Sequence, residues 1–150
     1  MFAPANQPAF TLALDGSPSD FKVFAFNGTE AISQPYRFEL ELVCEQPDID
    51  LEGLLHRQVY LGFDDQGHGV HGLVYRVAQG DSGRRLTRYQ LSLAPHLAYL
   101  AYSSHQRIFQ HKTVPQIVAQ VLAGQGIHSD RFEFRLSGDY PEREYCVQFG

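Results

Sequence analysis

Tryptophan is absent from this sequence, cysteine occurs only twice, and basic residues are outnumbered by acidic ones. Cys44 and Cys146 are too few for a disulfide framework, so we expect two free thiols in a reducing compartment. The formal net charge is −5, and no block of Lys or Arg occurs along the chain. Nucleic acids and anionic membranes are bound mainly through clustered cations, so neither is expected as a partner.

Long apolar runs are also missing, and none approaches the roughly 20 residues that a helix needs to cross a bilayer. Residues 1–8 have neither a basic start nor an apolar run, so we expect a flexible arm and no signal peptide. The 150 residues are 43% hydrophobic and 13% aromatic, and the aromatic residues are Phe and Tyr. This length and composition suffice for one domain with a sizeable core and favour strands over helices.

A hairpin over 69–95 is predicted at the centre of the chain. Its first strand, 70–78, is apolar on both faces, which indicates a central position with a neighbour on either side. Glycines at 80–83 predict the turn, and the returning strand is expected over 85–93. The residues predicted on the buried face of that returning strand are Tyr89, Leu91 and Leu93.

The most regular alternation in the sequence covers 36–44, which is predicted as a strand with one buried face. Its apolar residues are Tyr36, Phe38, Leu40, Leu42 and Cys44. Arg37, Glu39 and Glu41 occupy the other face, so a slip of one residue in register would bury three charges. The register of this strand is therefore well specified.

Shorter elements are expected on both sides of this strand. Strands are predicted at 9–14, 21–26 and 59–63, with turns at 15–19, 27–28 and 64–67. Asp50 is expected to cap a short helical turn over 51–56.

After the hairpin the pattern changes. Residues 96–102 are expected to be helical or irregular, and 103–112 show no clear periodicity. A helix is predicted from an N-cap at Thr113, with Gln116 completing a capping box and Gly124 or Gly126 ending it. Two last strands are predicted, at 132–136 and 145–149.

The predicted fold class is therefore mainly β with a minor α component, a curled sheet or β-barrel with one or two short helices. Because the last predicted strand continues to the end of the sequence, we expect a domain over 9–150 that is truncated at its C-terminal end.

No group of residues predicts catalysis, a metal site or a cofactor. His68 and His71 fall on opposite faces of a strand and have no further ligands at zinc spacing. Ser103, Ser104 and His105 are adjacent in sequence, which is not the arrangement of a nucleophile and its base. Glu39 and Glu41 are about 7 Å apart by strand rise, but alternating charges on an outer face are usually only solvated.

Several runs together resemble a known family. They are SHQRIFQ at 104–110, TVPQI at 113–117 and YPEREYCVQF at 140–149, preceded by SQPYRF at 33–38, LEL at 40–42, HGLV at 71–74 and YQLSLAP at 89–95. In content and order they are similar to the N-terminal hub region of VgrG spike proteins of type VI secretion systems. The resemblance covers about residues 10–149.

The resemblance implies a phage-tail-hub fold and a structural role. It implies a homotrimer in the full-length protein, seated on the Hcp tube and the baseplate, with effectors or adaptors as possible further partners. Such a spike is cytoplasmic before firing and is then delivered into a target cell, crossing membranes only by piercing them. It also implies that this chain is not an enzyme and holds no cofactor.

Two other functions stay open on the sequence alone: a β-barrel that binds a sugar or peptide, and a small hydrolase using Glu39 and Glu41 or a serine and histidine. Five residues are candidates for an interface. Tyr145, Gln148 and Phe149 are expected on a surface that the rest of the hub covers, while Arg107 and Phe109 are expected either there or as internal supports.

Overall fold

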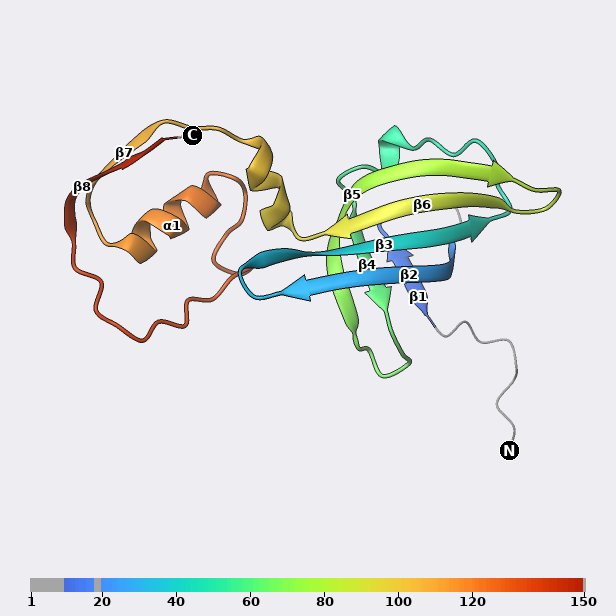
Figure 1. Ribbon diagram of the computed structural model, residues 1–150, viewed down its shortest axis with the longest axis horizontal. Helices are drawn as coiled ribbons and strands as arrows, with labels where there is room; N and C mark the ends of the chain where they lie inside the picture. Colours follow the sequence, from blue (N-terminus) through green and yellow to red (C-terminus); the bar gives the residue numbers. More distant parts are fainter. Residues whose placement is uncertain (1–9, 18–19, 150) are drawn as a thin grey trace. The chain divides into compact units, whose positions relative to one another are not determined.

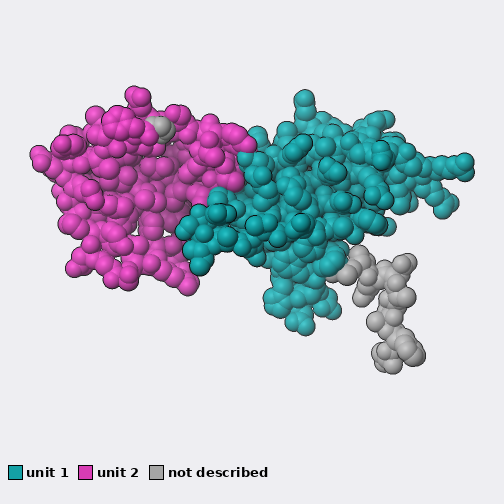
Figure 2. Space-filling view, in the orientation of Figure 1, with its two compact units in different colours: residues 1–95 teal, residues 96–150 magenta. Residues whose placement is uncertain are grey.

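The structure, a computed structural model, describes residues 10–17 and 20–149. They belong to two compact units, Met1–Pro95 and His96–Gly150, which Figure 2 shows in teal and magenta. The predicted arm at 1–8 lies outside the described residues. Each unit is considered below by itself.

Unit 1 is a six-stranded antiparallel sheet with the order β1-β4-β5-β6-β3-β2 (Figure 1). The strands are β1 (Thr11–Leu14), β2 (Lys22–Ala31), β3 (Gln34–Cys44), β4 (Gln58–Gly62), β5 (Gly69–Ser82) and β6 (Thr87–Ala94). The sheet curls so that its two edge strands approach each other, and the rings of Phe10 and Phe26 meet edge to face at 4.9 Å. This confirms the mainly β fold class with a strongly curled sheet.

The strand β5 has the central position that its two apolar faces predict. Its first part, Gly69 to Leu73, pairs with β4, and its second part, Leu73 to Ser82, pairs with β6. The register with β6 shifts between Val74 and Arg76 and again between Gln79 and Ser82. Such irregularities increase local twist, which suits a strand that passes from one neighbour to the other in a curled sheet.

The core of unit 1 lies on the inner face of the curl, and β3 and β6 supply much of it. Leu40 lies directly opposite Leu91, and both are buried. One position along, Glu41 lies opposite Gln90, and both are exposed. The alternation predicted for β3 is confirmed, and on β6 it holds only as far as Leu91, because Ser92 on the other face is buried as well. The buried residues that carry the pattern are Phe38, Leu40, Leu42, Cys44, Tyr89, Leu91 and Leu93.

The turn predicted at Asn27 and Gly28 is wrong. β2 continues through both residues to Ala31, and Ser33, with a φ of 63°, takes the left-handed conformation in the turn instead. Gly28 lies opposite Phe38, and a Cβ there would come within 2.2 Å of the phenyl ring. This glycine therefore makes room for a core aromatic ring.

The hairpin between β5 and β6 is confirmed, but its turn lies later than predicted. β5 runs on through Ser82, and Gly83 donates its N–H to the carbonyl of Leu86 at 2.9 Å. The extra residue that β5 takes up between Gln79 and Ser82 moves the turn along the chain. Gly80 therefore lies in the irregular stretch of β5, and the strand continues beyond it.

The helical turn predicted at 51–56 is shorter in the structure, where η1 covers Glu52–Leu54. The Asp50 carboxylate accepts the N–H of Gly53 at 3.2 Å, in the role expected of it.

Unit 2 contains η2 (His96–Tyr102), β7 (Arg107–Lys112), α1 (Val114–Ala123) and β8 (Arg143–Gln148). The helix, its Thr113 cap and the last strand were predicted. β7 was missed, since both faces of 107–112 mix apolar and polar residues.

The strand predicted at 132–136 is wrong. These residues are in no helix or strand, and their alternating side chains contact one another instead of a neighbouring strand. Arg135 donates two hydrogen bonds to the Glu133 carboxylate, at 3.0 and 3.1 Å, while the rings of Phe132 and Phe134 contact each other at 5.2 Å. Alternation alone does not make a strand when no neighbour completes the ladder.

Candidate interaction surface

The two-stranded sheet of unit 2 has two faces of different character. β7 and β8 pair antiparallel, with Ile108 opposite Val147 and Phe109 opposite Cys146. Because successive residues of a strand point to opposite faces, these two pairs lie on opposite sides of the sheet.

The inner face packs within unit 2. Phe109 is buried and Cys146 is half-buried. Arg107, on the same face, places its guanidinium beside Gly124 at the C-terminal end of α1. A cation is favourable there because the carbonyl groups at the end of a helix carry partial negative charge, a contribution of about 0.3–1 kcal/mol.

The helix on this side begins at the predicted cap. The Thr113 hydroxyl accepts the N–H of Gln116 at 3.4 Å, and the Gln116 side chain accepts the N–H of Thr113 at 2.8 Å. This capping box is confirmed. The C-cap is Gly124, and Gly126 follows with a φ of +77°.

The outer face is an exposed apolar surface, which we call the outer β7–β8 face. Its apolar residues and their exposed fractions are Ile108 (69%), Tyr145 (66%), Val147 (40%) and Phe149 (81%). At one end of the face Lys112 lies directly opposite Arg143. Neither cation forms a salt bridge within the described part of the chain, and like charges opposite each other in a sheet repel. The face is thus apolar with an unneutralised positive end.

The five interface residues expected from sequence divide between the two faces. Tyr145 and Phe149 lie on the outer face. Gln148 is half-buried and opposite Arg107, and Phe109 is buried, so these three side chains belong to the inner side. Ile108 and Val147 were not among the residues expected from the sequence. Their signal was that each strand carries apolar residues on both of its faces, so that one apolar face had to lie outward.

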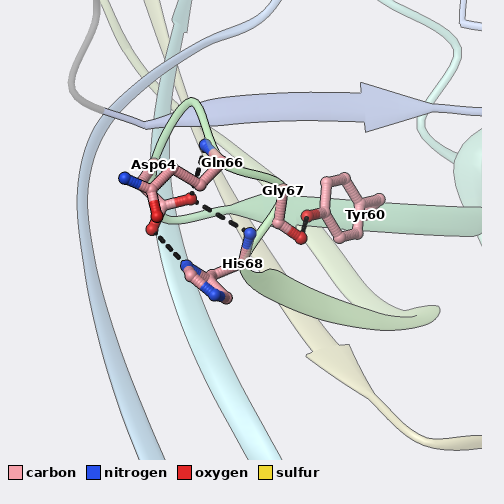
Figure 3. Close-up of polar contacts among 5 residues, drawn as sticks. All are labelled: Tyr60, Asp64, Gln66, Gly67 and His68. Atoms are coloured by element: carbon pink, nitrogen blue, oxygen red, sulfur yellow. Dashed lines mark hydrogen bonds and ion pairs between the residues drawn. The ribbon is translucent and has the colours of Figure 1, made fainter.

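In unit 1, a cluster of polar side chains stabilises the turn between β4 and β5 (Figure 3). One oxygen of Asp64 accepts the N–H groups of Gln66 and His68, both at 3.0 Å, and the other lies 2.6 Å from Nδ1 of His68. The hydrogen bond from the His68 ring holds the pKa of Asp64 below its ordinary value. Tyr60 donates its hydroxyl to the carbonyl of Gly67 at 2.8 Å. The cluster stabilises a turn, and the Asp-to-His spacing of four was its signal in the sequence.

Three of the residues considered for catalysis, Glu39, Ser103 and His105, form hydrogen bonds with other groups of the fold. Ser103 donates its hydroxyl to the carbonyl of Leu100 at 3.0 Å, and Nε2 of His105 lies 2.9 Å from the Gln125 amide. Glu39 accepts a hydrogen bond from the buried hydroxyl of Ser92. Across 10–17 and 20–149, no three His, Cys, Asp or Glu side chains are placed to hold a metal ion.

Helices in the described ranges are all too short or too polar to cross a bilayer.

Comparisons with known proteins agree with the fold. Residues 29–150 match the family described as phage tail baseplate hub (GPD). The chain belongs to this family.

Its relatives include spike proteins of type VI secretion systems. It is 62% identical over 149 residues to the spike protein VgrG4b of Pseudomonas aeruginosa, a match that covers 99% of this chain and 18% of the relative. It is 53% identical over 150 residues to VgrG5 of the same organism, covering 99% of this chain and 19% of the relative. The chain thus spans under a fifth of the length of these relatives.

A solved structure shares the fold. The Escherichia coli c3393 protein is superposed with a TM-score of 0.83 at 28% identity, over 93% of this chain and 39% of that one. That protein is described as a component of the type VI secretion system with structural similarity to the bacteriophage T4 tail proteins gp27 and gp5. The resemblance to VgrG spike proteins seen in the sequence is confirmed.

Proposed function

We propose that this chain is a structural building block of a type VI secretion spike, forming part of its hub. The observation that carries the proposal is the 62% identity to a spike protein across 99% of the chain. The shared fold with c3393, itself a component of that system, supports it.

In this role the chain acts within a trimer of spike polypeptides. The trimer is seated on the Hcp tube and in the baseplate, and is delivered through the secretion machine with its effectors or adaptors. The curled sheet of unit 1 suits a part that must transmit force. Its strands are joined by antiparallel ladders around one core, so that backbone hydrogen bonds and core packing hold the sheet together.

The role needs no catalysis and no bound cofactor. Of the residues considered for hydrolysis, Glu39, Ser103 and His105 form hydrogen bonds with other groups of the fold. A ligand-binding β-barrel, the other function considered from sequence, gains no support from relatives that are spike and hub proteins.

A chimeric spike tests this function. This chain replaces the matched 149-residue region of VgrG4b, and the chimera is expressed in Pseudomonas aeruginosa that lacks VgrG4b. We expect the chimera to appear in the culture medium when the secretion system is active. A matched chimera with Leu40→Asp, which places a charge in the core, should stay in the cells. A folded chimera that is never released would overturn the proposal; circular dichroism of the purified chimera establishes its folding.

A further inference from the structure

The turn between β5 and β6 carries two arginines, and we call residues 83–86 the arginine tip. Gly83 donates its N–H to the carbonyl of Leu86 at 2.9 Å, which leaves Arg84 and Arg85 between them at the end of the hairpin. Both arginines are exposed, and Leu86 beside them is 45% exposed. Neither arginine forms a salt bridge within the residues that the structure describes. The tip therefore offers two cations and an apolar side chain to a partner.

The segment that follows β3, residues 45–52, has the opposite charge, and we call it the acidic segment. It contains no Lys or Arg, and its acids are Glu45, Asp48, Asp50 and Glu52. All of them are exposed, and none forms a salt bridge in the described ranges. The core of unit 1 holds the segment in place, since Ile49 is buried and Tyr89 donates its hydroxyl to the carbonyl of Gln46 at 2.9 Å. Carboxylates fixed so close together repel one another and attract cations.

The arginine tip and the acidic segment lie at the same end of unit 1. Cys44, the last residue of β3, lies opposite Thr87 of β6, which in turn lies opposite Ser82 of β5. The acidic segment begins one residue beyond this row, and so does the arginine tip (Figure 1). Pro95, where unit 1 ends, follows the other end of β6.

This arrangement suits a contact between copies of the chain. In a ring of identical chains, each copy presents one surface to its neighbour and receives a different surface from the other side. The arginine tip and the acidic segment are such a pair, and their charges are complementary. The chain as a whole has a formal charge of −5, so copies repel on average, and the arginine tip is a place where a second copy is attracted.

We propose that, in the assembled spike, the arginine tip of one copy binds the acidic segment of the neighbouring copy. The inference rests on the proposed function, in which three spike polypeptides assemble. A tip of four residues buries far less than the roughly 800 Å² that each partner contributes to a stable complex. The contact therefore fixes the register of copies that other parts of the spike hold together, as complementary charges commonly do.

Carbodiimide coupling in the chimeric spike tests the inference, because it joins an amine to a carboxylate only where the two touch. Arg85→Lys places an amine on the arginine tip and keeps its charge. We expect new bands of two and three chain masses, with the new amide bond between the tip and residues 45–52. Arg131→Lys, at an exposed position of unit 2, is the matched control and should give no bond to 45–52. Lys22 lies 3.9 Å from Asp20, so their coupling within each copy shows that the reagent has acted.

Peptide mass spectrometry and the mass of each band separate the outcomes. A bond to 45–52 in a band of one chain mass would assign the pair to a single copy and overturn the inference. A bond to another protein or to a different part of the neighbour would also overturn it, as would no bond at all. Adding Arg84→Ala removes the second cation and should lower the yield of the product severalfold, whereas an unchanged yield would contradict charge attraction.

Release and sedimentation of the same chimera are measured separately, so the two proposals can fail independently. A chimera that is released as a trimer but lacks this bond rejects the further inference alone. A folded chimera that is never released rejects the proposed function.

Discussion

Leu40 on β3 and Leu91 on β6 show how single residues support the sheet of unit 1. They face each other in the core, and both are almost completely buried. We expect Leu40→Ala or Leu91→Ala to lower the free energy of unfolding by about 2–5 kcal/mol, through lost burial and the cavity that remains. Gln90→Ala, on the exposed face of the same strand, should cost less than ~1 kcal/mol. Urea denaturation measures both, and equal losses would contradict the assigned faces.

Gly28 is constrained by packing and not by a turn. A Cβ at this position would lie 2.2 Å from the Phe38 ring, so Gly28→Ala must displace a core side chain. The expected cost is about 1–3 kcal/mol. Gly80→Ala is the matched control on β5, since the nearest atom to its Cβ is 3.6 Å away, an ordinary contact. Thermal unfolding of the two variants compares them, and equal stability would show that the Phe38 ring does not limit this site.

The Asp64–His68 pair predicts a specific pH dependence. Its hydrogen bond from His68 lowers the pKa of Asp64 in the folded protein, so the charged carboxylate favours folding. That contribution is present above the pKa of an unfolded Asp, about 4, and is lost as the pH falls through the lower folded value.

We expect His68→Ala to raise the pKa of Asp64 toward its ordinary value, measured by NMR titration of the carboxyl carbon. His128→Ala is the control, because His128 is exposed and belongs to the other unit. An unchanged Asp64 titration in the His68 variant would show that this hydrogen bond has no effect on the carboxylate.

At the scale of the element, the helix α1 depends on its N-terminal cap. Thr113→Ala removes the acceptor for the Gln116 N–H and should cost about 0.5–2 kcal/mol. Thr113→Ser keeps a hydroxyl at the same place and should restore most of the loss. Chemical denaturation gives both values, and a Ser variant as unstable as the Ala variant would show that the cap does not act through its hydroxyl.

The sequence predicts elements well where one face is buried and the other wet. This holds for β3 and for β6 as far as Leu91, while Ser92 on the other face of β6 is buried. It fails at 132–136, where the charged residues of the alternation, Glu133 and Arg135, bond to each other and no strand forms. It also fails at β7, where the apolar Ile108 lies on an exposed face. In both cases the deciding factor is whether a neighbouring segment is present, which local pattern cannot express.

The candidate surface could be predicted only in part for the same reason. Tyr145 and Phe149 were expected on it, but Gln148 and Phe109 alternate to the inner side. Their placement follows from the pairing of β7 with β8, in which distant residues meet, such as Ile108 with Val147, 39 positions later in the sequence. Without that register, the sequence does not show that Lys112 and Arg143 lie together at one end of the outer face.

At the scale of the whole molecule, the chain corresponds to a small part of its longer relatives. The family match covers residues 29–150, and the spike relatives are more than five times longer than this chain, so we propose that most trimer contacts of a spike lie in its other parts. The isolated 150 residues should accordingly fold as a monomer with weak, concentration-dependent self-association.

Sedimentation equilibrium of the chimeric spike, beside the 150-residue chain, tests this claim most directly. We expect a mass of three chains for the chimera across the concentration range, and close to one chain, 16.9 kDa, for the shorter protein at low concentration. A folded chimera that sediments as a single chain at every concentration would contradict the assignment to a spike hub.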